Sequence, residues 1–390
     1  MPATHDLVLY GATGFTGRLT ARYLAENAPA DCRWALAGRD KTKLTAVRAE
    51  LTAIDPALAE LPLLHADAAD PESLRDLAAD TRVVISTVGP YLRYGEPLVA
   101  ACAAAGTDYV DLSGEPEFVD RMYLAHHATA RETGARLVHA CGFDSVPHDL
   151  GVLYTVEQLP EGVPLRVDGY VWSNATFSGG TLASVLGAFS RVPQMLAAAR
   201  ERREAEPRPR DRRVHLPLGG IRRQGLLGRW AVPLPTIDTQ IVGRSAAALD
   251  RYGPHFTYRH AAVTGRLSLA LGGVAAVAGL FALAQVPGVR RRLSARLAPG
   301  QGPSEERRAR SRFSVRFLAE GGGRRVATEV FGGDPGYDET AKILAESALC
   351  LAFDTLPTTS GQVTPAQAMG PALISRLRAA GLTFRVTHTG

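Results

Sequence analysis

The chain has 390 residues, of which 46% are hydrophobic and 21% are charged, and its formal net charge is +5. This length allows two domains that each have a core, and the composition is ordinary for a globular protein. The four cysteines have no CxxC spacing, which argues against a disulfide framework and a structural zinc site, so we predict no metal site. No basic region followed by an apolar signal segment opens the chain, so we expect a cytoplasmic protein.

The positive charge is concentrated in two arginine-rich stretches. Residues 200–213 hold seven arginines against four acids, and residues 290–312 hold eight arginines. Such stretches favour anionic phosphates, acidic proteins or membrane surfaces as partners. No aromatic residues are interleaved with them, so we predict no nucleic-acid partner. The first stretch is also typical of a solvated helix end and linker.

The chain opens with a predicted strand, a glycine turn and a helix. Residues 7–10 form an apolar run typical of a buried parallel strand, and residues 18–26 are helical in character. Gly11, Gly14 and Gly17 lie between them, which is the pattern that seats a dinucleotide pyrophosphate on a helix N-terminus. We expect the first glycine to permit the tight turn, the second to let the phosphates approach the backbone, and the third to let helix and strand lie close. The intervening residues that we also expect to contact the cofactor are Thr13, Phe15 and Thr16.

The end of the second predicted strand, residues 33–37, predicts which dinucleotide binds. An NAD-binding domain places an acidic side chain there, about 20 residues beyond the glycines, against the ribose hydroxyls. This chain instead has Arg39, with Lys43 shortly after it. A guanidinium can pair with a 2′-phosphate and stack on adenine, so we predict NADP(H). The alternative is a solvated basic turn in which Asp40 neutralises the neighbouring charges.

Four further predicted strands, residues 61–65, 83–88, 109–112 and 136–140, alternate with helices. This alternation predicts an α/β fold with a Rossmann-type doubly wound parallel sheet. The carboxyl ends of such strands line the ligand crevice. The residues that we expect to border the cofactor there are Asp67, Thr87, Val88, Gly89, Pro90, Gly142 and Phe143.

The second half of the chain predicts a different architecture. Residues 166–172, 312–318 and 325–331 alternate like strands with few helices between them, which favours an α+β substrate domain. A helix is predicted to open at residues 179–181, Gly-Gly-Thr, and later helices at residues 336–353 and 365–378. We therefore predict an NADP-binding domain over residues 1–148, a substrate domain over residues 149–362, and a C-terminal helix within residues 363–390 that packs back on the first domain.

Residues 267–289 form an uncharged stretch inside the predicted substrate domain. The length alone admits a transmembrane helix. A single crossing would, however, separate strands that we expect to pair in one sheet. We therefore favour a helical insertion at a membrane surface, aided by the following arginines. A buried helix, a helix at a homodimer interface and a true membrane span stay open as alternatives.

Several motifs together carry a resemblance to a known family. GATGFTGRL, AGRDKTKL, STVGPYLRYGEPLVAACAAAGTDYVDLSGE and CGFDSVPHDLG resemble those of saccharopine dehydrogenase-like oxidoreductases, and more closely the bacterial group called trans-acting enoyl reductases. The similarity continues in GYDETAKILAESALCLA and VTPAQAMG, so it covers most of the chain.

The resemblance implies NADPH-dependent hydride transfer to a small-molecule acyl substrate. In the enoyl reductase group, the implied substrate is an unsaturated polyketide or lipid chain, which we expect to be presented by an acidic acyl carrier protein. Two alternatives stay open: an amino-acid dehydrogenase of the saccharopine type, and a non-catalytic NADP-binding protein at a membrane or lipid surface.

Such a reaction needs a group that stabilises the developing enolate and delivers one proton. The loops after the fourth, fifth and sixth strands offer Tyr91, Tyr94, Asp144, Ser145 and His148 as candidates. Tyr91, Asp144 and Ser145 are the ones that we predict to be catalytic. Each also has a structural interpretation, because the tyrosines suit a core and Asp144 and Ser145 suit a helix cap.

Overall fold

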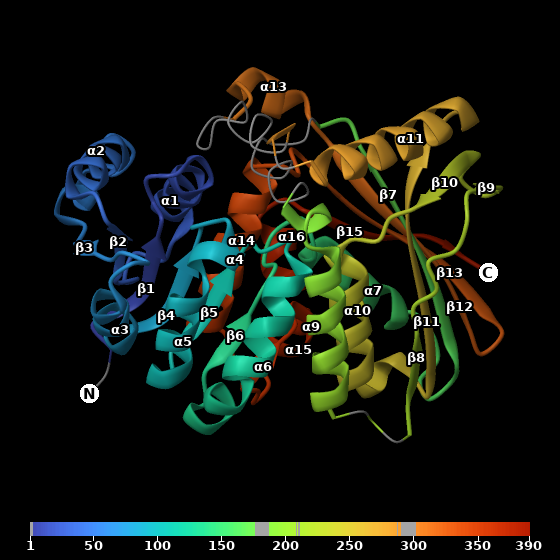
Figure 1. Cartoon of the computed structure of the whole chain (residues 1–390), viewed down its shortest axis with the longest axis horizontal. Coiled ribbons are helices and arrows are strands. Elements are labelled where there is room, and N and C mark those ends of the chain that lie inside the picture. Colours follow the sequence, from blue (N-terminus) through green and yellow to red (C-terminus); the bar gives the residue numbers. More distant parts are fainter. Residues whose placement is uncertain (1–2, 176–186, 208, 210, 287, 290–301) are drawn as a thin grey trace. The chain divides into compact units, whose positions relative to one another are not determined.

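The computed structural model describes residues 3–175, 187–207, 209, 211–286, 288–289 and 302–390 (Figure 1). The chain divides into two compact units. The first consists of Met1–Phe143 and Tyr337–Ala380, and the second of Asp144–Gly336 and Gly381–Gly390. Each unit contains its own β-sheet, so the predicted division into an α/β part and an α+β part is found in the structure.

The sheet of the first unit has the strand order β14-β6-β5-β4-β1-β2-β3, and every pairing in it is parallel. The strands are β1 (His5–Tyr10), β2 (Trp34–Gly38), β3 (Leu63–His65), β4 (Thr81–Ser86), β5 (Asp108–Asp111), β6 (Arg136–Val138) and β14 (Gly361–Val363). The first six follow the doubly wound order 3-2-1-4-5-6, which confirms the predicted Rossmann-type sheet. Successive strands are added on one side of β1 up to β3 and on its other side from β4 onward, and ligands bind outside the carboxyl ends of the strands at this switch point.

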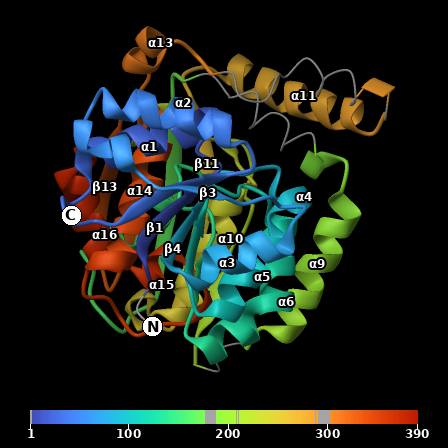
Figure 2. The same cartoon turned by 90° about the vertical axis from the view of Figure 1, so that its left-hand side faces the viewer.

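Helices cover both faces of this sheet (Figure 2). One face carries α3 (Pro71–Ala79), α5 (Glu96–Ala105) and α6 (Pro116–Thr133), which pack against one another. The other face carries α1 (Phe15–Asn27) and α14 (Asp338–Phe353), and α14 also contacts β1, β4 and β5. The remaining helices of the unit are α2 (Lys41–Thr52), η1 (Pro56–Glu60), α4 (Tyr91–Tyr94), α15 (Pro365–Ala368) and α16 (Gly370–Ala379).

The structure corrects the predicted domain boundaries. The first unit ends at Phe143 rather than at residue 148, and it also includes residues 337–362, which we predicted to belong to the substrate domain. The reason is the burial of α14, whose residues from Ile343 to Ala352 are all buried. A helix whose residues are buried on all sides needs cover on every side, and α1, α16 and the sheet supply it. The predicted C-terminal helix is found as α15 and α16, and α16 packs on α14 within the first unit, as predicted.

The second unit contains a mixed sheet with the order β15-β13-β12-β7-β11-β10-β9, and β8 pairs with β11. The strands are β7 (Leu165–Ser173), β8 (Arg213–His215), β9 (Arg222–Gln224), β10 (Arg229–Pro233), β11 (His255–Thr264), β12 (Phe313–Gly321), β13 (Arg324–Gly332) and β15 (Thr383–Thr389). The helices are α7 (Val146–Val156), α9 (Val192–Ala205), α10 (Ile237–Ala248), η2 (Asp250–Tyr252), α11 (Leu267–Ala284) and α13 (Glu305–Arg310). The helix predicted to open at residues 179–181 begins outside the described residues.

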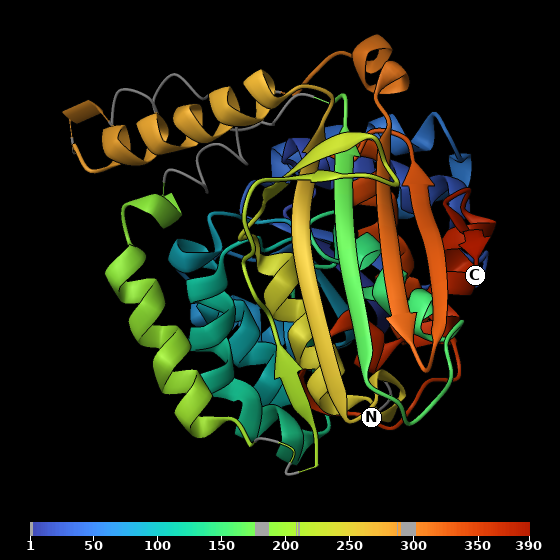
Figure 3. The ribbon, with the colours of Figure 1, turned by 90° about the vertical axis from the view of Figure 1, so that its right-hand side faces the viewer.

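Two helices, α7 and α10, cover one face of this sheet, and Figure 3 shows the long strands from the opposite side. Gly151 sets how closely α7 approaches the sheet, because a Cβ atom there would lie 2.4 Å from the ring of Phe317 on β12. α10 packs against both α7 and β11. The helices α7 and α10 and the strand β11 are therefore packed directly against one another inside the second unit.

The uncharged stretch forms α11, which is long and apolar enough to cross a membrane by length and composition. Only 11% of it is buried, so the interpretation as a buried core helix is wrong for the chain by itself. Figures 1 and 3 show that most of its length projects beyond the end of the sheet. Its neighbours in the chain, β11 and β12, both pair with β7. A single membrane crossing would put these two strands on opposite sides of a bilayer, so a single span does not fit this fold.

Candidate functional site

The turn after β1 has the geometry that its first glycine was expected to provide. Gly11 has a φ of +91°, and a Cβ atom there would lie 2.6 Å from the side chain of Val88. The hydroxyl of Thr87 donates a hydrogen bond that is shared between the carbonyls of Tyr10 and Gly11, at 3.2 and 3.1 Å. The end of β4 therefore holds the turn in place, and only glycine fits the first position without strain.

The other two glycines differ in what surrounds them. A Cβ atom on Gly17 would lie 2.2 Å from the carbonyl oxygen of Gly11, so a helix residue with a side chain cannot fit here. A Cβ atom on Gly14 would meet only that same oxygen, at 3.4 Å, and Gly14 is exposed in an ordinary extended conformation. The protein itself therefore requires glycine at position 17 but not at position 14. The space beside Gly14 is free for a ligand.

Gly14 is also the N-cap of α1, and it leaves the start of this helix without a side-chain cap. The first turn of α1 contains no acidic residue. The backbone N–H groups at such a helix start are available to an anion, and the helix dipole favours negative charge there. The ring of Phe15, at the first position of α1, packs edge-on against Tyr337 with 4.8 Å between the ring centroids. The arrangement around Gly14 thus fits a pyrophosphate group.

The basic residues after β2 differ in how well their charges are compensated. Lys43 lies 3.5 Å from the carboxylate of Asp40, which also accepts a hydrogen bond from the Lys43 N–H at 3.1 Å. Arg39 is exposed, and among the described residues it has neither a hydrogen bond nor an ion pair. An uncompensated guanidinium beside the glycine turn is suited to a 2′-phosphate. Arg39 therefore fits its predicted role better than Lys43 does.

We expect the variant Arg39→Ala to bind NADPH about 10- to 100-fold more weakly, because it loses one charge-assisted pair worth roughly 1.5–3 kcal/mol. Binding of NADH should change little, since NADH lacks the 2′-phosphate. Fluorescence titration with both cofactors measures the two dissociation constants, and Arg75→Ala, on the exposed face of α3, is the matched control. Equal binding of NADPH and NADH by the unaltered protein would contradict the assignment.

Asp67 shapes the loop after β3. Its carboxylate accepts a hydrogen bond from the N–H of Ala69 at 3.0 Å, and its own N–H donates to the hydroxyl of Ser73 at 3.1 Å. Burial and the charge of Asp67 raise the pKa of Tyr10 at the end of β1. The charge of Arg39 also acts on Tyr10, so these three side chains gather at the carboxyl edge of the sheet. A contact between Asp67 and the cofactor remains a prediction.

The loop after β4 begins with Thr87, Val88, Gly89 and Pro90, and the Gly89–Pro90 peptide bond is cis. Gly89 and Pro90 are exposed, whereas Tyr91 is buried. The Tyr91 hydroxyl donates to the carbonyl of Ser86 at 3.0 Å and accepts from the N–H of Leu112 at 3.1 Å. Burial raises the pKa of Tyr91 well above its usual value. Tyr91 thus links β4 to β5, and the structure argues against its predicted role as a proton donor.

A buried hydrogen-bond network that the sequence analysis missed holds the ends of β5 and β6 together. Asp111 accepts hydrogen bonds from the N–H groups of Ser113 and Ala140 and from the hydroxyl of Tyr109, at 2.9, 3.0 and 3.0 Å. Its carboxylate also lies 2.7 Å from Nδ1 of His139. The sequence hint of this network was Asp111, a polar residue at the end of a strand. The network fixes the backbone that leads into the predicted cofactor residues.

The predicted cofactor residues Gly142 and Phe143 end Met1–Phe143, the first of the two segments that make up the first unit. A Cβ atom on Gly142 would lie 2.8 Å from Leu112, so a larger residue would not fit. The N–H of Phe143 donates to the hydroxyl of Thr340 on α14, at 3.1 Å. The loop after β6 is therefore held by a segment that lies almost 200 residues further along the chain, as the sequence separation of 197 shows.

The second unit begins with the remaining catalytic candidates. Asp144 is exposed, yet the surrounding protein and the charge of Asp238 raise its pKa to about 7; water around the exposed part weakens this effect. Ser145 is buried at the N-cap position of α7, but its hydroxyl does not cap the helix. His148 is buried, and burial lowers its pKa to about 3, so the imidazole is neutral at pH 7. Of the three residues, only Asp144 is exposed and able to exchange a proton with a ligand.

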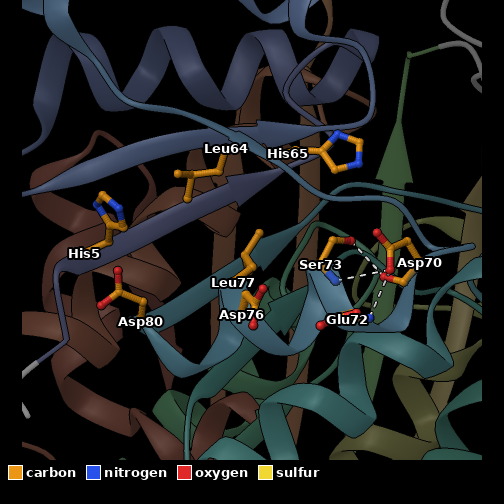
Figure 4. Close-up of a pocket in the computed structure, with 9 residues that line it drawn as sticks. All are labelled: His5, Leu64, His65, Asp70, Glu72, Ser73, Asp76, Leu77 and Asp80. Carbon is orange, nitrogen blue, oxygen red and sulfur yellow. Dashed lines mark hydrogen bonds between the residues drawn. The ribbon is translucent and has the colours of Figure 1, made fainter.

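The first unit also has a hollow of about 520 Å³ beside α3, shown in Figure 4. The residues that line it are His5, Leu64, His65, Asp70, Glu72, Ser73, Asp76, Leu77 and Asp80. Four of these are carboxylates, so the local charge disfavours a phosphate-bearing ligand. The hollow is therefore separate in character from the glycine turn and is not suited to the cofactor.

Comparison with known proteins matches this arrangement to one family. Residues 7–138 match the family described as "Saccharopine dehydrogenase NADP binding domain". The chain is 39% identical to the trans-acting enoyl reductase of Mycobacterium bovis strain BCG, over 98% of each chain. It is 42% identical to a provisionally named trans-acting enoyl reductase of Mycobacterium tuberculosis, over 99% of this chain and 98% of the relative.

Among solved structures, apo saccharopine dehydrogenase (L-Glu forming) from Saccharomyces cerevisiae aligns with a TM-score of 0.53. The alignment covers 98% of this chain and 100% of the yeast chain, at 12% identity, so it supports the fold alone. The sequence identities of about two fifths, which extend over nearly the whole length, show the family. The chain belongs to the saccharopine dehydrogenase-like oxidoreductases, in the group of the trans-acting enoyl reductases.

Proposed function

We propose that the protein is an NADPH-dependent enoyl reductase that acts in trans on an unsaturated acyl intermediate. The observation that carries the proposal is the glycine turn, with open space beside Gly14 and an uncompensated Arg39, in a chain that matches enoyl reductases over nearly all of its length. These residues suit the pyrophosphate and the 2′-phosphate of NADPH. Bound NADPH supplies the hydride that such a reduction needs.

The chain's own residues then have to bind the acyl group and supply one proton. In the overall reaction, the hydride forms the new C–H bond at the β-carbon, the carbon–carbon double bond is lost, and a proton is added at the α-carbon. We assign the proton transfer to Asp144, which is exposed and follows directly after the predicted cofactor residues Gly142 and Phe143. A carboxyl group whose pKa is raised toward neutrality suits a general acid.

The test is a spectrophotometric assay of NADPH oxidation with enoyl thioesters of increasing chain length, presented on coenzyme A and on an acyl carrier protein. We expect oxidation of NADPH to match the formation of an acyl product two mass units heavier. A preference for the carrier-bound substrate would support a protein partner, as expected for a basic chain that meets an acidic carrier. NADPH binding without turnover of any enoyl thioester would favour the non-catalytic alternative.

We also propose that α11 attaches the protein peripherally to a membrane surface. Leu269, Leu271 and Val277 on this helix are 62, 53 and 56% exposed, and Arg266 precedes it at an exposed position. An exposed helix that is apolar on all sides, next to a positive charge, suits the interface of an anionic bilayer. Attachment there would also place the enzyme close to a lipid substrate.

The triple variant L269Q/L271Q/V277Q should lose most binding to anionic vesicles in a flotation assay and keep its NADPH affinity. All three side chains are exposed, so we expect the unit to fold normally. The control L196Q/L218Q changes two equally exposed leucines elsewhere in the second unit and should still bind. If the unaltered protein does not bind vesicles and is dimeric, whereas the triple variant is monomeric, α11 is a subunit interface instead.

A further inference from the structure

Three side chains that lie far apart in the sequence meet in the interior of the second unit. They are His148 on α7, Asp238 on α10 and His260 on β11, and one potential metal-ligand atom of each lies within 4.8 Å of those of the other two. Their side chains are only 2, 5 and 1% exposed. The packing of α10 against both α7 and β11 brings them together.

The distances within this group are too long for ordinary hydrogen bonds. Nδ1 of His148 lies 3.5 Å from Oδ1 of Asp238, and Nε2 of His260 lies 3.6 Å from Oδ2. Hydrogen bonds between nitrogen and oxygen are typically about 2.7–3.2 Å long. Two ligands bound to one tetrahedral Zn²⁺ at about 2.0–2.1 Å are roughly 3.3 Å apart. The two distances from histidine nitrogen to carboxylate oxygen are therefore close to the spacing of ligands around a common metal ion, and the whole group lies within 4.8 Å.

Neighbouring residues orient two of the three side chains. The hydroxyl of Tyr258 lies 2.8 Å from Nδ1 of His260, which directs the other ring nitrogen toward Asp238. Gly169, the register partner of His260 on β7, makes room for this contact, because a Cβ atom there would lie 2.6 Å from the Tyr258 hydroxyl. The hydroxyl of Thr236 donates a hydrogen bond to Oδ2 of Asp238. Outer hydrogen bonds of this kind are typical of metal ligands.

The charge in this interior also favours a cation. Among the described residues, Asp238 forms no ion pair with a lysine or an arginine, and its polar neighbours are the hydroxyls of Thr236 and Ser145 and the two histidines. A buried carboxylate without a cation is costly, and a bound metal ion removes this cost.

We propose that His148, Asp238 and His260 bind one divalent transition-metal ion. Two imidazoles and one carboxylate suit Zn²⁺ and related ions, whereas Ca²⁺ and Mg²⁺ prefer oxygen ligands throughout. The absence of CxxC spacing did not predict this site, because its ligands are two histidines and an aspartate that are far apart in the sequence. The ion would connect α7, α10 and β11 and leave one coordination position for water or another ligand.

The test uses the full-length protein after removal of metals with a chelator. We expect calorimetric titration with Zn²⁺ to give one tight site per chain, and Co²⁺ to give the visible absorption of a tetrahedral nitrogen and oxygen site. The variants His260→Gln and Asp238→Asn should weaken the binding of Zn²⁺ by more than about 10-fold. Tyr258→Phe, which removes only the outer hydrogen bond, should weaken it about 10-fold, at the lower end of such effects.

The control is His255→Gln, which changes an exposed histidine on the same strand and should bind Zn²⁺ like the unaltered protein. Circular dichroism of each metal-free variant shows whether it folds. If His260→Gln and Asp238→Asn do not fold, the Co²⁺ spectrum of the unaltered protein shows whether the metal site exists. The proposal is wrong if the unaltered protein binds no Zn²⁺, gives no tetrahedral Co²⁺ spectrum, or binds Zn²⁺ as tightly after substitution of His260 or Asp238.

Discussion

The variant Gly14→Val is expected to fold normally and to bind NADPH at least about 100-fold more weakly than the unaltered protein. A Cβ atom at this position meets no protein atom closer than 3.4 Å, Gly14 is exposed and its φ is ordinary, so the fold should tolerate a side chain there. It would, however, occupy the space where phosphate oxygens reach the helix N-terminus. Losing two hydrogen bonds to a charged group, each worth roughly 1.5–3 kcal/mol, accounts for the expected effect.

The matched variant Gly17→Ala should behave in the opposite way. Its Cβ atom would lie 2.2 Å from the carbonyl oxygen of Gly11, so the backbone must move, at a cost of about 1–3 kcal/mol in the free energy of unfolding. Thermal denaturation should therefore separate the two variants, and isothermal titration with NADPH measures binding by each. A stable Gly14→Val variant that retains tight NADPH binding would place the phosphates elsewhere.

The second large effect is expected for Asp144→Asn, which should lower kcat by about 10²- to 10⁴-fold, as the loss of a general acid does. The amide has nearly the same shape as the carboxyl group but cannot deliver a proton. The NADPH dissociation constant should stay unchanged, because this residue is assigned to the acyl group rather than to the cofactor.

Two further variants separate a catalytic role of Asp144 from a structural one. Asp144→Glu keeps a carboxyl group and should retain more activity than Asp144→Asn. Asp211→Asn removes an exposed carboxylate elsewhere in the second unit and should leave kcat unaffected. Equal losses in the Asn and Glu variants, together with a lower melting temperature, would assign Asp144 a structural role.

The βα unit at the start of the chain was predictable from its sequence because its determinants are local. The apolar run of β1, the spacing of three glycines and the start of α1 follow one another within about twenty residues, which is the usual span of such a fingerprint. The alternation of strands and helices up to residue 140 likewise gave the parallel sheet. The preference for NADP(H) followed from one residue at a strand end, Arg39.

The boundary between the units depended on contacts that sequence periodicity does not report. α14 and β14 lie in the chain between strands β13 and β15 of the second sheet, yet they pack with the first unit, since the burial of α14 requires the faces of α1 and of the first sheet. The sequence likewise left the environment of α11 undecided, because an apolar helix can be buried, bound to a membrane or packed against a partner. Its exposure appears only once the surrounding elements have been placed.

The side-chain chemistry was decided by tertiary structure in the same way. A tyrosine in a strand-end loop can donate a proton or fill a core, and the hydrogen bonds of Tyr91 to β4 and β5 were needed to distinguish these roles. His148, Asp238 and His260 share no motif, because their spacing along the chain is set by intervening loops and not by the site. Sequence therefore determined the cofactor turn, whose residues are neighbours in the chain, whereas folding determined the clusters whose residues become neighbours only through the packing of distant elements.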